Sequence, residues 1–190
     1  MCRYRVEPGY GARFPDAKII SLEPSKKNYE TLLLNVNGFG NVIPLHAGLW
    51  KSMSQLRLVN CTTNGNSWER EWGFQVEEVS NWNETEAEFI MTGLTVEFLL
   101  RLFDLQSFDF AKIDIEGSEK ELFTRSETNT LKWMESTSLF MVEVHDMMRA
   151  GAKAIVDGVF NKSGDNKFHM LKDYGMFQAW TNTRLIPTSS

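Results

Sequence analysis

Apolar residues gather in four short runs along the chain, and these runs predict the strands of a sheet. They cover Lys18–Leu22, Val42–His46, Phe110–Ile115 and Leu139–Val144. Each run is nearly continuous, whereas a strand with one solvent-exposed face would alternate apolar and polar residues. Continuous runs are typical of strands covered on both faces of a parallel sheet. We therefore expect these four segments to be buried parallel strands.

Between the runs, apolar residues return at helical spacing. One apolar stripe follows Ser25, which is a favourable N-cap residue. Its members are Tyr29, Leu32, Leu33 and Val36. Two further helices are predicted over Val96–Phe103 and Ala152–Phe160. The first helix lies between two predicted strands, so the chain opens with a strand–helix–strand unit that has a right-handed crossover.

Two short apolar runs near the end of the chain, Phe168–Leu171 and Phe177–Trp180, flank Tyr174 and Gly175. A glycine between two such runs is typical of a turn that joins antiparallel strands. The whole pattern predicts an α/β fold with a mostly parallel sheet and an antiparallel C-terminal strand. We expect residues 1–190 to form a single domain of this class.

The stretch Phe110–Phe123 is the most informative of the chain, because it combines a buried strand, a tight turn and a helix. Gly117 interrupts the apolar run, and Ser118 can cap a helix that carries Glu119. Asp114 and Glu116 stand at the end of the strand. An extended chain would place these two carboxylates on the same side, roughly 6–7 Å apart.

Polar residues end each of the four predicted strands. They are Glu23, His46, Asp114 with Glu116, and Glu143 with His145. The carboxyl ends of parallel strands share one edge of a sheet, and ligands bind at that edge in open α/β sheets. We therefore expect these residues to line one cleft, with Glu23 and Asp114 both pointing into it.

Glu23 has two interpretations that the sequence does not separate. An acid at the end of a strand can accept hydrogen bonds from both hydroxyls of a ribose. The same acid can instead interact with the N-terminal end of the helix that follows Ser25. A ribose acid should have a glycine-rich turn about 20 residues upstream, and the residues near Arg3 contain no such turn.

The same strand ends raise the question of a metal. Carboxylates and imidazole are ligands for Mg²⁺, Mn²⁺ or Zn²⁺. The candidates are Asp114, Glu116, Glu143, His145 and Asp146. Ordinary polar strand ends that are hydrogen-bonded to nearby loops are the simpler interpretation, and we predict no metal site. The sequence also lacks a Ser-His-Asp pattern, a Cys-His pattern and a phosphate loop, so it offers no support for acyl transfer or nucleotide hydrolysis.

The composition of the chain indicates which classes of partner it can bind. The net charge is -5 and the pI is about 5.3, which argues against a general nucleic-acid binder. No apolar run is long enough to span a membrane, and the N-terminal residues lack the apolar core of a signal peptide. The two cysteines, Cys2 and Cys61, have no metal-ligand spacing. We expect a cytoplasmic protein that binds neither nucleic acid nor membrane.

Four stretches of the chain resemble the FkbM-type S-adenosylmethionine-dependent methyltransferases. The most specific is K-I-D-I-E-G-S-E, within residues 110–123. The supporting stretches are F-P-D-A-K-I-I-S-L-E-P-S-K-K-N-Y-E-T-L-L-L-N at 14–35, N-V-I-P-L-H-A-G-L-W at 41–50 and M-V-E-V-H-D at 141–146. The resemblance implies a Rossmann-like methyltransferase sheet and methyl transfer from S-adenosylmethionine to a hydroxyl oxygen of a small molecule or carbohydrate.

By motif position, the resemblance implies that Glu23 binds the ribose of S-adenosylmethionine and that Asp114 lies beside its methionine part. It places Glu116 and His145 near the acceptor. If the acceptor is a hydroxyl, the candidates for its catalytic base are Asp114, Glu116 and His145.

The chain departs from this family before Ala12, where the family's first strand and its D-x-G-A-N-x-G turn are expected and not found. We expect either a fragment of a longer protein or a protein without this cofactor loop. Either way we expect weak binding of S-adenosylmethionine and a strand edge that favours self-association. The alternatives to an active methyltransferase are an inactive domain that binds only a ligand or partner, and a nucleotide-sugar enzyme with a similar sheet.

Overall fold

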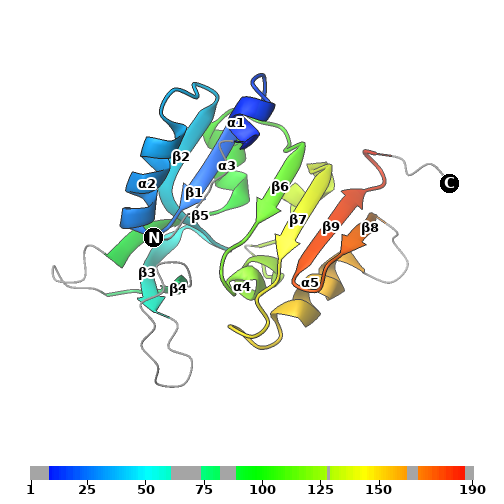
Figure 1. Ribbon diagram of the computed structural model, residues 1–190. Coiled ribbons are helices and arrows are strands. Elements are labelled where there is room, and N and C mark those ends of the chain that lie inside the picture. The colour runs from blue at the N-terminus through cyan, green and yellow to red at the C-terminus, as the bar shows by residue number, and fades with distance from the viewer. Residues whose placement is uncertain (1–8, 61–73, 82–88, 128, 162–166, 187–190) are drawn as a thin grey trace. The chain divides into compact units, whose positions relative to one another are not determined.

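A computed structural model describes residues 9–60, 74–81, 89–127, 129–161 and 167–186 (Figure 1). The chain divides into two compact units. The first comprises Met1–Leu49 and Met53–Gly93, and the second comprises Trp50–Ser52 and Leu94–Ser190. Each unit has its own hydrogen-bonded strands, and each is described by itself below.

The first unit opens with the predicted strand–helix–strand unit. Strand β1 (Ile19–Glu23) pairs in parallel with β2 (Val42–Leu49), and helix α2 (Lys26–Val36) joins them. The side chain of Ser25 accepts a hydrogen bond from the N–H of Asn28, so the predicted N-cap is confirmed. The pairing sets Glu23 opposite His46.

Antiparallel strands complete the sheet of this unit. Strand β3 (Ser54–Asn60) pairs with both β4 (Phe74–Glu78) and β5 (Ile90–Leu94), and the sheet order is β1-β2-β5-β3-β4. Close packing favours a glycine at Gly48 on β2, because a Cβ there would lie 2.7 Å from a methyl group of buried Leu56. Ahead of β1, the short helix α1 (Gly9–Arg13) is tied down by the side-chain amide of Asn41, which donates to the carbonyl of Gly11.

The second unit contains a four-stranded sheet. Figure 1 shows β6, β7, β9 and β8 side by side in that order. Strands β6 (Phe110–Ile113) and β7 (Leu139–Glu143) are parallel. Strand β9 (Phe177–Asn182) is antiparallel to both β7 and β8 (Phe168–Asp173), which confirms the predicted C-terminal antiparallel pair.

The described residues of this unit form four helices: α3 (Val96–Leu102), α4 (Glu119–Phe123), the 3-10 helix η2 (Lys132–Ser136) and α5 (Ala152–Phe160). Helices α3 and α5 confirm the two predictions from apolar spacing. Among the residues that the structure describes, no helix combines the length and apolar character needed to cross a membrane.

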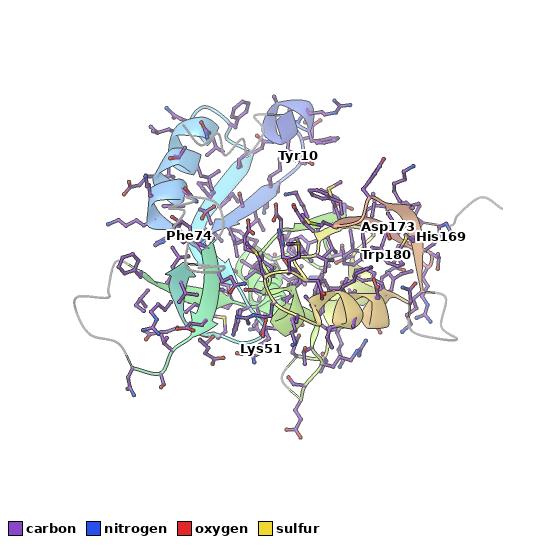
Figure 2. The ribbon with its side chains drawn as sticks, turned by 60° about the horizontal axis from the view of Figure 1, so that its bottom comes forward. Tyr10, Lys51, Phe74, His169, Asp173 and Trp180 are labelled. Atoms are coloured by element: carbon purple, nitrogen blue, oxygen red, sulfur yellow. The ribbon has the colours of Figure 1, made fainter. Side chains whose placement is uncertain are left out.

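The core of the second unit is largely aromatic. Six rings from its helices and strands lie with neighbouring centroids 4.9–6.2 Å apart. They belong to Phe123, Trp133, Phe140, Phe160, Phe168 and Trp180. In Figure 2, Trp180 marks β9, while His169 and Asp173 mark its neighbour β8. Packed aromatic rings bury much apolar area, so this core holds α4, η2 and α5 against the strands.

Two sequence predictions about the strands are wrong. All four predicted parallel strands exist, but β1 is half-buried throughout and Phe110 on β6 is 42% exposed. The reason is that each of these strands lies at the end of its sheet, with one hydrogen-bonded neighbour among the described residues. The sheets are also not mostly parallel, because antiparallel pairs outnumber parallel ones in the described part of the chain. Helix α1 and strand β5 were not predicted.

Candidate functional site

Five ionisable side chains of the second unit converge where β6 and β7 end. They are Asp114, Glu116, Glu119, Glu143 and His145, and we refer to them as the His145 cluster. The parallel register pairs Ile113 with Val142, so both strands end at the same level. The acid that follows each of these residues therefore comes to the same edge of the sheet.

Glu116 reaches the cluster through an unusual turn. Its φ is 53°, in the left-handed region that non-glycine residues rarely adopt, and Gly117 follows with a φ of 96°. Strand β6 ends at Ile113, so the predicted extended spacing of Asp114 and Glu116 is not observed. The turn nevertheless brings the Glu116 carboxylate to 3.4 Å from Nε2 of His145. Backbone strain of this kind costs on the order of 1 kcal/mol and is common at functional sites.

His145 is the centre of the cluster, and its side chain is only 10% exposed. Its Nδ1–H donates to Oε1 of Glu119 at 3.0 Å, because a carboxylate can only accept. Its Nε2 lies 3.6 Å from Oε1 of Glu143 and 4.0 Å from Oδ1 of Asp114. Two of the predicted site residues, Asp114 and Glu116, are thus brought together with the third, His145.

Glu119 is the residue of this site whose role the sequence did not reveal. It occupies the first turn of α4 and is fully buried. Besides holding His145, its Oε1 accepts from the backbone N–H of Ile115 at 3.2 Å. The signal for its role was an acid in the same stretch as Leu122 and Phe123, since a buried glutamate is rare unless it is paired.

Two neighbouring residues differ from their predicted roles. Ser118 precedes α4 as expected, but its side chain makes no cap hydrogen bond, and its backbone is in the helical region that does not aim the hydroxyl at the helix N–H groups. Asp146, a predicted candidate metal ligand, instead accepts hydrogen bonds from the N–H groups of Gly151 and Lys153 at the start of α5. Its carboxylate therefore stabilises that helix end.

Burial and mutual interactions shift the pKa values of three side chains in the His145 cluster. Burial alone would lower the pKa of His145, but the hydrogen bond to Glu119 and the surrounding carboxylates outweigh burial and raise this pKa to about 9. Burial, reinforced by Asp114 and Glu143, raises the pKa of Glu116 to about 7. Burial and the charge of Asp114 also raise the pKa of Glu143. Carboxylates crowded in this way favour a bound cation or a shared proton.

Glu23 and His46 lie in the first unit and have local partners. Oε1 of Glu23 accepts from the N–H of Ser25 at 2.8 Å, as the helix-end interpretation of this residue requires. His46 Nε2 lies 3.1 Å from the carbonyl oxygen of Pro24, to which it can only donate, and its ring stacks on Tyr29. A common cleft for Glu23 and Asp114, and a ribose contact at Glu23, stay predictions.

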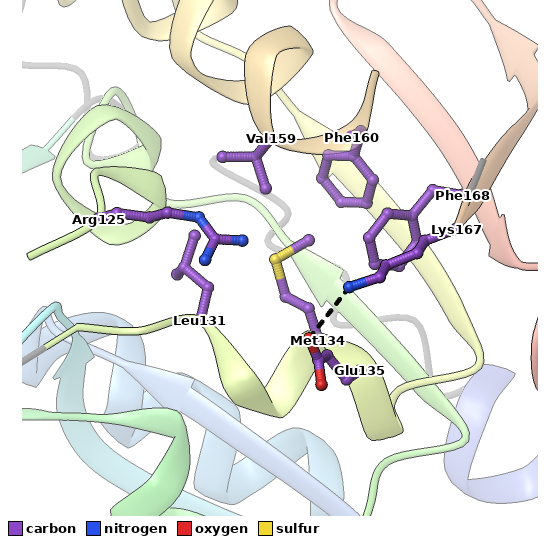
Figure 3. A pocket seen from close by; sticks show the side chains of 8 residues that line it. All are labelled: Arg125, Leu131, Met134, Glu135, Val159, Phe160, Lys167 and Phe168. Atoms are coloured by element: carbon purple, nitrogen blue, oxygen red, sulfur yellow. Dashed lines mark hydrogen bonds and ion pairs between the residues drawn. The ribbon is translucent and has the colours of Figure 1, made fainter. Parts of the chain in front are cut away.

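A small cavity occurs elsewhere in the second unit, between η2, α5 and the start of β8 (Figure 3). It encloses about 90 Å³, far below the several hundred Å³ of a typical ligand site. Its two cations have partners, since Lys167 pairs with Glu135 and Arg125 donates to the carbonyl of Thr130. Figure 3 shows Lys167 and Glu135 joined across its rim. It shares no residue with the His145 cluster.

Comparison with known proteins identifies the domain. A family model described as the methyltransferase FkbM domain matches residues 9–172. No curated protein and no solved structure matched the chain. The matched residues include both parallel strand pairs and the whole His145 cluster.

Proposed function

Because the chain belongs to the FkbM methyltransferase family, we propose that it transfers a methyl group from S-adenosylmethionine to a hydroxyl oxygen of a small molecule or sugar. The acceptor oxygen bonds to the methyl carbon as the bond from that carbon to the sulfonium sulfur breaks. The hydroxyl proton passes to a base on the protein. The His145 cluster carries this proposal, because it supplies proton acceptors at the end of two parallel strands.

Glu116 is our choice of base. Asp114, the other carboxylate among the predicted bases, holds Lys112 at 2.7 Å, and Glu119 is fully buried. The side chain of Glu116 is 20% exposed, and its Oε2 faces the imidazole of His145. His145 then acts as a positioning residue that fixes the direction of the Glu116 carboxylate.

Labelled methyl transfer tests the reaction. Purified protein is incubated with millimolar S-adenosylmethionine, because the sequence predicts weak binding, and with a panel of sugars and polyols. We expect Glu116→Gln to lower kcat by about 100-fold or more, the usual contribution of a positioned base. Glu127→Gln removes the same charge at an exposed position and should leave kcat unchanged.

Calorimetric titration with S-adenosylmethionine tests the cofactor. Glu23→Gln and Asp114→Asn should each weaken binding by about 10-fold or more, which is what losing a charge-assisted hydrogen bond costs. Binding without transfer to any acceptor supports the alternative of an inactive ligand-binding domain. If the chain neither binds S-adenosylmethionine nor transfers a methyl group, the proposal is wrong.

A further inference from the structure

Three metal-type ligands meet at the ends of β6 and β7. One oxygen each of Asp114 and Glu143 and one nitrogen of His145 lie within 4.8 Å of one another. Ligands bound to one cation at about 2.0–2.2 Å are themselves roughly 3–4 Å apart. The observed separations of 3.6 and 4.0 Å from His145 Nε2 to the two carboxylates fit this spacing. We propose that Asp114, Glu143 and His145 bind a divalent cation of the Mn²⁺ or Zn²⁺ class.

The way His145 is held is an independent reason. Histidines that ligate metals commonly donate their other ring N–H to a carboxylate, which fixes the tautomer and the ring direction. Nδ1–H of His145 makes this bond to fully buried Glu119. The opposite nitrogen, Nε2, is then directed at carboxylate oxygens of Glu116, Glu143 and Asp114, none of which donates a hydrogen when ionised. A divalent cation bound between Nε2 and these carboxylates would take the place of a proton there.

The net negative charge of the His145 cluster also favours a bound cation. Four carboxylates surround one imidazole, and Lys112 pairs with Oδ2 of Asp114. The other oxygen of Asp114, Oδ1, is the one nearer to His145. One divalent cation would offset the remaining negative charge without displacing Lys112.

The donor set selects the class of cation. Carboxylates alone suit Mg²⁺ or Ca²⁺, whereas a buried imidazole favours first-row transition metals and Zn²⁺. Three protein ligands leave coordination positions for water or a hydroxyl. A hydroxyl bound to such a cation loses its proton more readily. This last consequence rests on the proposed methyl transfer, while cation binding does not. The sequence favoured ordinary polar strand ends, and the geometry of His145 reverses that preference.

Titration with Mn²⁺ alone tests the site. The whole chain is stripped with a chelator, and free Mn²⁺ is followed by electron paramagnetic resonance, with Zn²⁺ as competitor. We expect one Mn²⁺ per chain, displaced by Zn²⁺. Asp114→Asn and Glu143→Gln should each weaken binding by at least the 10- to 100-fold that is typical of losing even an outer partner of a metal ligand. Glu127→Gln is the matched control and should bind as the unaltered chain does.

The variant Glu119→Gln tests whether Glu119 orients the imidazole of His145 for metal binding. We expect weaker Mn²⁺ binding, by about 10- to 100-fold, although Glu119 is not itself a ligand. Asp114 is partly exposed, so Asp114→Asn should fold even if a variant at a buried position does not. A circular dichroism melt of each variant establishes this.

The metal proposal is overturned if Mn²⁺ and Zn²⁺ fail to bind at about 1 mM, or if Asp114→Asn and Glu143→Gln bind as tightly as Glu127→Gln. Neither result involves S-adenosylmethionine. A chain that binds Mn²⁺ without transferring methyl groups would retain this site and lose the proposed function. A chain that transfers methyl groups equally well after chelation would retain the function and lose any role for the cation in it.

Discussion

Each of the two parallel strand pairs of this protein carries an acid and a histidine, but the groups around them differ. Glu23 at the end of β1 and its register partner His46, three residues before the end of β2, each bond to a nearby backbone group. At the end of β6 and β7, the imidazole of His145 is surrounded by four carboxylates. An acid and a histidine on neighbouring parallel strands are therefore not a site by themselves. The loops that follow the strands decide whether the charge is satisfied locally or left for a ligand.

The loops differ in what they bring. After β1, the residues Pro24 and Ser25 present a carbonyl and an N–H within reach of the side chains. After β6, the turn through Glu116 and Gly117 starts a helix whose first residue, Glu119, is another acid. The first arrangement stabilises the fold, whereas the second concentrates negative charge around one buried nitrogen.

The largest difference should appear when the acid nearest each helix start is truncated. Glu119→Ala removes the partner of a buried imidazole and should lower the free energy of unfolding by about 3–5 kcal/mol. Glu23→Ala removes one acceptor of a backbone N–H and should cost about 1 kcal/mol. Urea denaturation of both variants measures this. Equal losses would show that the two strand ends are held in the same way.

Addition of a cation should separate the two histidines. At a Mn²⁺ concentration of 100 times its Kd, the free energy of unfolding should rise by about 2.7 kcal/mol. His145→Gln should lose this gain, and His46→Gln should keep it, because His46 donates to Pro24 and faces no acidic cluster in the described residues. Thermal unfolding with and without Mn²⁺ provides the measurement. A gain that survives His145→Gln would place the cation elsewhere.

Substitution in the strained turn at Glu116 should raise the free energy of unfolding, by less than the largest changes described above. Asn tolerates the left-handed region better than Glu and carries no charge, so Glu116→Asn should stabilise the chain by about 1 kcal/mol. The same change should lower methyl transfer, because it removes the proposed base. Asp104 also has a positive φ, 52°, and is exposed, so Asp104→Asn should change neither quantity. Urea denaturation measures the change in stability, and the methyl-transfer assay measures the change in activity. Loss of stability in Glu116→Asn would show that the turn is not strained.

The smallest effect distinguishes the two serines at the helix starts. Ser25→Ala should cost about 1 kcal/mol, because the side chain caps α2. Ser118→Ala should cost less than about 0.5 kcal/mol or be stabilising, because the buried hydroxyl of Ser118 has no hydrogen-bond partner among the described residues. Chemical denaturation of the pair resolves this difference. A comparable loss in Ser118→Ala would indicate a hydrogen bond to a group outside those residues.

Much of the candidate site could be predicted from the sequence, because it depends on position along strands. Asp114, Glu116, Glu143 and His145 were recognisable as polar residues at the ends of apolar runs, and parallel pairing brings such ends together. The role of Glu119 was not predictable, since it depends on a turn that folds the start of α4 back under His145. The family resemblance rested on the same stretch of sequence and is confirmed.

The sequence alone determined most of the strands and helices and the family, because apolar periodicity and local motifs are properties of neighbouring residues. Only the tertiary structure decided which strands lie at sheet edges, since burial depends on partners distant in the chain. It also decided that His145 faces carboxylates while His46 faces a carbonyl. Both histidines end apolar strands in the sequence. Their different chemistry arises because electrostatic interaction depends on distance through space, and the turns after the strands set that distance.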